Sequence, residues 1–211
     1  MKDLAAKFLT ASEKEKIINA VKNVEKITSG EIVPMVVSSS YHYPVSDIIG
    51  SFIISMIISL GTVFILQNQY LWLFLAVFMV SFVVFHEIIK AALPLKRLFI
   101  SEKEITEEVE ESAVTSFFNK GLSNTRDKTG VLIYISIFER KVWVLADSGI
   151  NKKVPEDTWK KIVDIIVEGI RNKQQGEAIV KAITMVGDIL KSHFPVREHD
   201  VDELDNLIIE D

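Results

Sequence analysis

Two long apolar runs in the first half of the chain constrain its fold more than any other feature. The first, residues 48–66, has no charged or histidine side chain, and the second, residues 70–93, is interrupted only by His86, Glu87 and Lys90. At about 1.5 Å per residue, a helix over the first run would be about 28 Å long, close to the roughly 30 Å hydrocarbon thickness of a bilayer. The pattern predicts a transmembrane helical hairpin, with a buried helix pair in a soluble protein as the alternative.

The charges that flank the two runs predict how the hairpin is oriented. Lys96, Arg97 and Lys103 follow the second run, whereas the turn at residues 67–69 has no Lys or Arg. Because cytoplasmic flanks are enriched in these residues, we expect both termini in the cytoplasm and only the turn outside. Residues 1–10 lack the apolar stretch of a signal peptide. The predicted location is the inner cell membrane, crossed twice, with Lys96 and Arg97 at an anionic lipid surface.

The composition excludes several classes of function. The net charge is −5 and no basic patch occurs, which argues against nucleic acid as a partner. The chain has no cysteine, so disulfides, thiolate metal sites and cysteine nucleophiles are excluded. It also lacks a phosphate-binding loop, a dinucleotide-binding glycine motif, a zinc-protease motif and a nucleophile elbow.

The segments on either side of the hairpin alternate between helical and strand patterns. A capping-box sequence at Thr10 precedes apolar residues at helical spacing, and Glu31–Val37 is a short run rich in β-branched residues. After the hairpin, the sequence predicts a helix from Ser101 to Gly121, strands over 131–138 and 141–146, and two helices that begin at Pro155 and after Gly176. The last of these helices ends near His193.

Three features of the predicted strands and helices carry further expectations. Pro34 cannot donate a backbone hydrogen bond, which indicates an edge position or a bulge for its strand. Glu139 and Arg140 separate two strands and are interpreted as a charged hairpin turn, with substrate binding as the alternative. Trp143 and Trp159 are interpreted as core anchors, with a binding platform as the alternative.

Small residues recur on one face of the first apolar run. Ser51, Ser55 and Ser59 are spaced by four residues, so they share a helix face that another helix can approach closely. We expect this face to pack against the second run through Ala76 and its neighbours. A homodimer interface is the alternative, so the oligomeric state stays open.

The soluble segments must combine into one domain. Residues 1–47 hold only one helix and one strand, too little to bury a core, so they must pack with residues 97–195. We therefore predict the fold class α/β, with a mixed β-sheet, helices on its faces and a transmembrane α-hairpin at 48–93 as an interruption. Residues 196–211 form an acidic tail with four docking candidates, Leu204, Leu207, Ile208 and Ile209.

Several segments together resemble the TPM-domain family, and in particular its bacterial membrane-protein branch, which has two spans inside the domain. The resembling residues are Thr28–Gly30 with Glu31 and Ile32, then Ala113, Phe117, Gly121–Thr125, 130–133, 139–142, 146–150, 193–195 and 202–204. The resemblance implies an α/β sandwich and is linked to phosphatase activity, divalent-metal binding and the maintenance of membrane complexes. Other branches place the domain outside the cytoplasm behind a signal peptide, a pattern from which this chain departs.

Four acidic residues are candidates for a shared metal site. Glu31 begins one predicted strand, Asp127 precedes the next, Asp147 ends the third, and Asp157 lies in the following helix. Carboxylates at strand ends and in the loops that follow suit Ca²⁺ or Mg²⁺. Each residue also has a plain structural interpretation, because acids favour turns and the first turns of helices.

Three functions remain open on the sequence alone. The first is a membrane-anchored α/β domain that contacts the lipid bilayer and binds or scaffolds a membrane-protein partner. The second is a weak metal-dependent phosphatase that uses the four carboxylates. The third, a channel or transporter subunit, has only the polar residues between His86 and Lys90 to support it.

Overall fold

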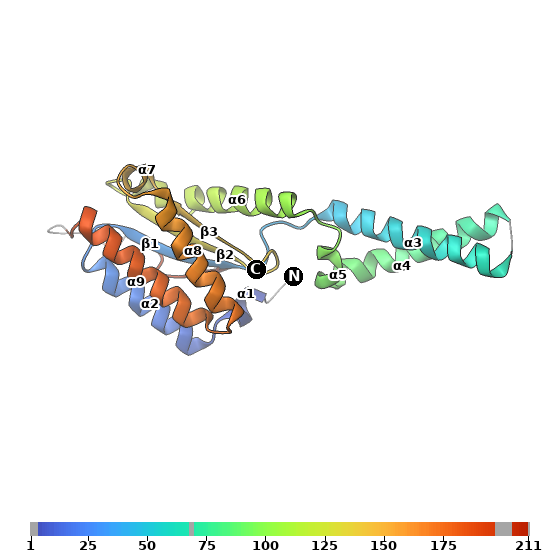
Figure 1. The fold of residues 1–211 in the computed structure, drawn as a ribbon, viewed down its shortest axis with the longest axis horizontal. Coiled ribbons are helices and arrows are strands. Elements are labelled where there is room, and N and C mark those ends of the chain that lie inside the picture. The colour runs from blue at the N-terminus through green and yellow to red at the C-terminus, as the bar shows by residue number, and fades with distance from the viewer. Residues whose placement is uncertain (1–3, 68–69, 197–203, 211) are drawn as a thin grey trace. The chain divides into compact units, whose positions relative to one another are not determined.

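The computed structural model describes residues 4–67, 70–196 and 204–210, which fall into two compact units (Figure 1). The sheet unit contains the chain up to Tyr41 and from Thr106 onward, and the hairpin unit is His42–Ile105. Residues 1–3, 68, 69, 197–203 and 211, which include parts of the predicted hairpin turn and of the acidic tail, lie outside the described residues.

The sheet unit is built on a mixed four-stranded sheet. Its strands are β1 (Glu31–Val37), β2 (Gly130–Ser136), β3 (Lys141–Ala146) and β4 (Ile208–Glu210), in the order β3-β2-β1-β4. β1 is parallel to both β2 and β4, whereas β2 and β3 form an antiparallel hairpin. The predicted mixed α/β sheet and its β2–β3 hairpin are therefore confirmed.

Helices cover both faces of this sheet (Figure 1). On one face lie α2 (Ala11–Glu25), α8 (Glu156–Arg171) and α9 (Gln175–His193), and α6 (Glu102–Asn119) packs on the other from Thr106 onward. Alternation along β1 supplies both cores, because Ile32 and Val36 join the first while Val33, Met35 and Val37 join the second. The remaining short helices are α1 (Leu4–Phe8), α7 (Ser148–Asn151) and η1 (Leu122–Asn124).

The predicted capping box at the start of α2 is confirmed. The Thr10 hydroxyl accepts from the Glu13 N–H at 3.3 Å, and the Glu13 carboxylate accepts from the Thr10 N–H at 2.8 Å. The same carboxylate accepts from the Gly176 N–H at 3.3 Å, which connects the starts of α2 and α9. The backbone hydrogen bond from Thr10, with the one from its hydroxyl, lowers the pKa of Glu13.

The prediction that Pro34 marks an edge strand or a bulge is wrong. β1 lies between β2 and β4, and its register with β2 is continuous. The Glu31 N–H donates to the Thr129 carbonyl and the Ser38 N–H to the Glu210 carbonyl, so even-numbered residues of β1 face β4. β4 pairs only with residues 35–37, and the missing N–H of Pro34 therefore falls just before β4 begins.

The fourth strand lies where the sequence predicts no strand. β4 occupies residues 208–210 of the acidic tail, with Ile208 in the core beneath α6 and Ile209 against the opposite core. A second contact fixes the strand, because Lys120 pairs with Glu210 at 2.5 Å. Three residues are too few to show an alternating pattern, so only the pairing with β1 defines this strand.

The hairpin unit consists of two long helices, α3 (Pro44–Leu66) and α4 (Leu71–Ala91), followed by the short α5 (Leu93–Arg97). Ser51, Ser55 and Ser59 are fully buried where α3 packs on α4, so the predicted packing within the hairpin is confirmed. Ala76, however, is exposed. The rings of Phe52 on α3 and Phe78 on α4 lie edge to face at 5.5 Å.

A buried ion pair joins the start of α3 to α5. The Lys96 ammonium lies 3.0 Å from the Asp47 carboxylate and also donates to the His42 carbonyl. Lys96 is only 3% exposed, so the prediction that it faces a lipid surface is wrong. Its neighbour Arg97 lies 3.4 Å from Glu102.

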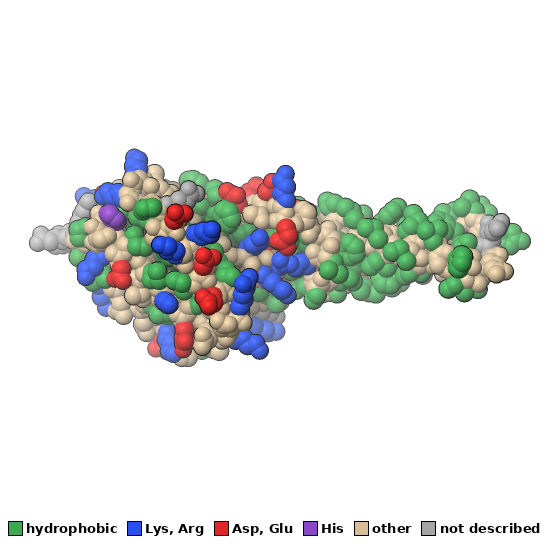
Figure 2. Space-filling model, in the orientation of Figure 1, with side chains coloured by type: hydrophobic (Ala, Val, Ile, Leu, Met, Phe, Trp, Pro, Cys, Tyr) green, Lys and Arg blue, Asp and Glu red, His purple; other side chains and the backbone are tan. Residues whose placement is uncertain are grey.

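Both hairpin helices are long and apolar enough to cross a membrane. Their apolar side chains are largely exposed, with Phe64 85% and Trp72 80% accessible. Green apolar side chains cover the visible face of the hairpin unit, whereas charged side chains are spread over that of the sheet unit (Figure 2). The soluble alternative would require the helix pair to be buried, and the described residues of this chain do not bury it.

Candidate functional site

Three of the four predicted metal-binding acids come to the same end of the sheet. Glu31 is the register partner of Gly130, and the Gly130 carbonyl accepts from the Asp147 N–H at 2.9 Å. The loop that holds Asp127 runs against Gly149, where an added Cβ would lie 2.7 Å from the Asp127 carbonyl. The fourth acid, Asp157, is exposed in the first turn of α8.

Two of these acidic residues, Asp147 and Glu31, have local structural surroundings that bear on metal binding. Asp147 is the N-cap of α7, where its Oδ1 accepts from the Ser148 N–H at 2.5 Å, and its Oδ2 is buried without a hydrogen-bond partner among the described residues. Glu31 is buried, at 8% exposure. No group of three or more His, Asp or Glu side chains among the described residues is arranged to hold a metal ion. The shared metal site therefore stays a prediction.

A closed polar network occupies the opposite end of the sheet. Glu139 is fully buried and accepts from the Ser39 hydroxyl and the Ser40 N–H, each at 3.0 Å, and from the Ser136 hydroxyl. The predicted turn is present, since Arg140 follows with a φ of 55° and donates its N–H to the Ile137 carbonyl. The sequence does not reveal this burial, because a Glu-Arg pair between strands is typical of an exposed turn.

Tyr134 extends the network across the sheet to α6. Its hydroxyl lies 2.8 Å from the Ser112 hydroxyl and 3.2 Å from the Ser40 hydroxyl. Burial raises the pKa of Tyr134, as do the negative charges of Glu139 and Glu210, and the two serine hydrogen bonds oppose this. With Tyr134 1% exposed and Glu139 fully buried, the network stabilises the fold and offers little surface to a substrate.

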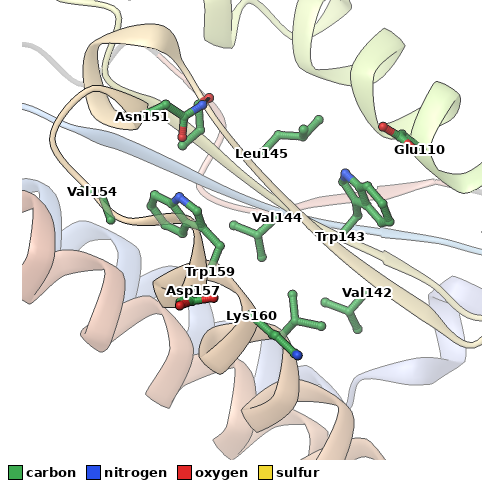
Figure 3. A pocket seen from close by; sticks show the side chains of 12 residues that line it. Glu110, Val142, Trp143, Val144, Leu145, Asn151, Val154, Asp157, Trp159 and Lys160 are labelled. Carbon is green, nitrogen blue, oxygen red and sulfur yellow. Dashed lines mark hydrogen bonds between the residues drawn. The ribbon is translucent and has the colours of Figure 1, made fainter.

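One open site of the sheet unit is a groove along the outer edge of β3, with a volume of about 740 Å³ (Figure 3). Trp143 and Leu145 lie on one side of the strand with Glu110 of α6, and Val142 and Val144 lie on the other side, toward α8 (Figure 3). The rest of the lining is Ala146, Asn151, Val154, Asp157, Trp159, Lys160 and Val163. We call this surface the β3 groove.

Both tryptophans of the sheet unit contribute to the core as well as to the β3 groove. Trp159 is 8% exposed and belongs to the core beneath α8, which confirms its prediction as an anchor. Trp143 is only partly buried and packs against the core beneath α6. Partly exposed aromatic and aliphatic side chains beside a few charged ones are typical of binding surfaces.

Comparison with known proteins finds two similarities. Residues 98–189 match the sequence model of the TPM domain. This part of the chain is similar to the TPM domain. The matched range begins after α5, so this match does not extend to the two apolar helices.

A solved structure has a similar fold. The NMR structure of the BA42 protein from the psychrophilic bacterium Bizionia argentinensis matches over 100% of each chain, with a TM-score of 0.62 and 23% identity. Similarity at this identity shows the fold alone. No protein with a curated description matches the sequence.

Proposed function

We propose that this protein is a TPM domain held at a membrane by the α3–α4 hairpin, where the domain binds a protein partner. The observation that carries the proposal is the largely exposed apolar surface of two helices long enough to span a bilayer. The helices are inserted between β1 and α6, so each side of one fold continues directly into the hairpin. Such an insertion holds the domain close to the lipid surface on the side where both termini lie.

Membrane extraction tests the first part of this proposal. The full chain should stay in the membrane pellet after washing at alkaline pH and appear in the supernatant only after detergent is added. Release by the alkaline wash alone would contradict a membrane-spanning hairpin.

The natural absence of cysteine makes the orientation directly measurable. In intact cells, a membrane-impermeant maleimide should label Gln67→Cys at the end of α3 and leave Thr184→Cys on α9 unlabelled until the cells are opened. The opposite labelling pattern would place both termini outside and overturn the cytoplasmic location.

The second part of the proposal is that the sheet unit binds a partner. It is supported by the open β3 groove and by the absence, among described residues, of a three-residue metal group. A photo-crosslinking residue in place of Lys160 should yield discrete adducts in cells, whereas the same residue in place of exposed Lys22 on α2 should not. Equal adduct patterns from both positions would contradict a partner at the groove.

A metal-dependent phosphatase is the second candidate, favoured by the acids at one end of the sheet and by the buried Oδ2 of Asp147. Purified protein would be assayed on p-nitrophenyl phosphate with Mg²⁺ or Ca²⁺. Under this candidate, Glu31→Gln, Asp127→Asn, Asp147→Asn and Asp157→Asn lose turnover, while the exposed control Asp188→Asn keeps it. Turnover that is absent in the natural protein, or unchanged in all four variants, would eliminate this candidate.

A further inference from the structure

We propose that the β3 groove binds an extended segment of the protein partner, which adds to β3 as a fifth strand and alternates basic and apolar side chains. This inference rests on the proposed partner-binding function and specifies the partner's chemistry. Strand addition at a free sheet edge uses backbone hydrogen bonds for affinity and side-chain pockets for specificity.

The backbone of β3 is oriented for such an addition. The Asp147 N–H donates to the Gly130 carbonyl, so the odd-numbered residues of β3 face β2 in this antiparallel pair. The N–H and C=O groups of Val142 and Val144 therefore point away from β2, as does the Ala146 N–H. The Ala146 carbonyl already accepts from the Asn151 side chain at 2.7 Å. Within the described part of the chain, no strand pairs with this edge.

Apart from Lys141 at its start, β3 has no charge or proline that would protect a free strand edge. Residues 142–146 include no charge and no proline, and the unbroken register with β2 leaves no bulge. The opposite edge of the sheet differs, because β4 is only three residues long and ends in Glu210. Short or charged edge strands resist pairing with other chains, whereas a longer, apolar and regular edge favours it.

The side chains around β3 specify what the added segment would carry. On the side of Trp143 and Leu145, the groove is bounded by the exposed carboxylate of Glu110, which suits a Lys or Arg of the segment (Figure 3). On the side of Val142 and Val144, the wall is formed by α8, whose Trp159 and Val163 suit apolar side chains. Asp157 and Lys160 of the same helix are exposed beside them and bring one charge of each sign. Alternate side chains of a strand point to opposite faces, so one segment meets both requirements with a period of two.

The walls of the groove favour a lone segment over a second copy of this chain. α6 and α8 both contribute lining residues, so the edge of β3 lies between two helices. A second copy would bring its own helices on both faces of its sheet against these walls. A single extended segment carries no such layers and fits a groove of about 740 Å³.

The experiment measures fluorescence anisotropy of a labelled hexapeptide, acetyl-KVKVKV-amide, with the full chain in non-ionic detergent. Saturable binding is expected. Two further peptides have methylated backbone nitrogens, one at every lysine and the other at every valine. Because only alternate N–H groups of an added strand face β3, one methylated peptide should lose binding and the other should retain it. No saturable binding, or equal binding by the two methylated peptides, would overturn the proposal.

Charge reversal on α6 provides matched variants. Glu110→Lys should weaken binding of the basic peptide about five- to tenfold, because it replaces an attraction with a repulsion. Glu111→Lys makes the same change at an exposed residue of α6 outside the groove lining and should leave binding unchanged. Equal effects of the two variants would overturn the proposal, since the charge of α6 would then change peptide affinity whether or not the residue lines the groove.

A backbone variant tests the edge itself. Val144→Pro removes an outward N–H at an edge position, where proline is tolerated, and should abolish peptide binding while circular dichroism stays unchanged. A concentration-dependent dimer that the peptide disperses would assign the edge to a second copy and overturn the proposal. The peptide assay contains no bilayer, so a negative result in it would contradict strand addition at β3. Release of the protein by an alkaline wash would instead contradict the membrane-spanning hairpin.

Discussion

The hairpin unit and the sheet unit bury opposite kinds of side chain. In the hairpin unit Ser51, Ser55 and Ser59 are fully buried while Phe64 is 85% exposed. In the sheet unit Ile133 and its neighbours in the sheet are fully buried, and charged side chains other than Glu31 and Glu139 lie at the surface of the described part (Figure 2). Apolar side chains gain stability from burial only where the surroundings are water, and small residues bring helices together where the surroundings are lipid. The proposed membrane location, with one unit in water and the other in lipid, requires a difference of this kind.

The largest expected effect comes from disrupting the buried ion pair of the hairpin unit. Lys96→Met removes one partner of the buried ion pair and leaves the Asp47 carboxylate uncompensated, so we expect a loss of about 3 to 5 kcal/mol. The loss would be measured by unfolding in sodium dodecyl sulfate followed by circular dichroism. The double variant Lys96→Met with Asp47→Asn should recover much of it. A double variant no more stable than the single one would show that the charge pairing is unimportant.

The apolar interior of the sheet unit should respond nearly as strongly. Ile133→Ala at the centre of β2 opens a cavity in a fully buried position, and we expect a loss of about 3 kcal/mol in the free energy of unfolding by urea. The matched change Phe64→Ala removes a larger side chain from an exposed position and should alter that free energy by less than about 0.5 kcal/mol. Comparable losses in both variants would remove the contrast between the two units.

A smaller effect sharpens the role of the buried serines. Ser55→Leu inserts a larger side chain between α3 and α4, and we expect a loss of about 2 kcal/mol in the same sodium dodecyl sulfate titration. Ser55→Ala keeps the close approach and should cost less than about 0.5 kcal/mol, because its hydroxyl bonds only to the Ser51 carbonyl within the helix. A more stable Ser55→Leu hairpin would show that the helices do not need close contact.

The smallest effect concerns an exposed element of the sheet unit and depends on pH. The pKa of Glu13 is lowered in the folded state, so its stabilisation is present above the ordinary value of 4.5 and is lost as the pH falls through the lowered value. Glu13→Gln should therefore cost about 0.5 kcal/mol near neutral pH and progressively less below pH 4.5. Urea unfolding at several pH values checks this, with the exposed Glu15→Gln as a control that should show no such trend.

Periodicity predicts most of the fold, and pairing across long separations explains what it misses. The strands Glu31–Val37 and Lys141–Ala146 and the start of α2 follow from local patterns and capping. β4 and the interior position of β1 do not, because each depends on a partner more than a hundred residues away. Likewise, the burial of Glu139 depends on serines that follow β1, and its neighbours along the chain give no sign of it.

The candidate site was predicted only in part for the same reason. Strand ends indicated where Glu31 and Asp147 lie, because sheet topology brings such ends together. The β3 groove is formed by an edge strand between α6 and α8, and which strand is left at the edge follows from the strand order. A sequence with no visible alternation in residues 142–146 gave no indication that this edge would be open.

The interior position of β1 has a consequence for how the chain is made. β1 is synthesised before either of its neighbours, since β2 begins at Gly130 and β4 at Ile208. At about 5 to 20 residues per second, β1 waits several seconds or more for β2 and longer for β4. During that interval both hairpin helices emerge from the ribosome. Under the proposed membrane location, the hairpin would enter the bilayer while β1 still has two bare edges, which would couple assembly of the sheet to insertion of the hairpin.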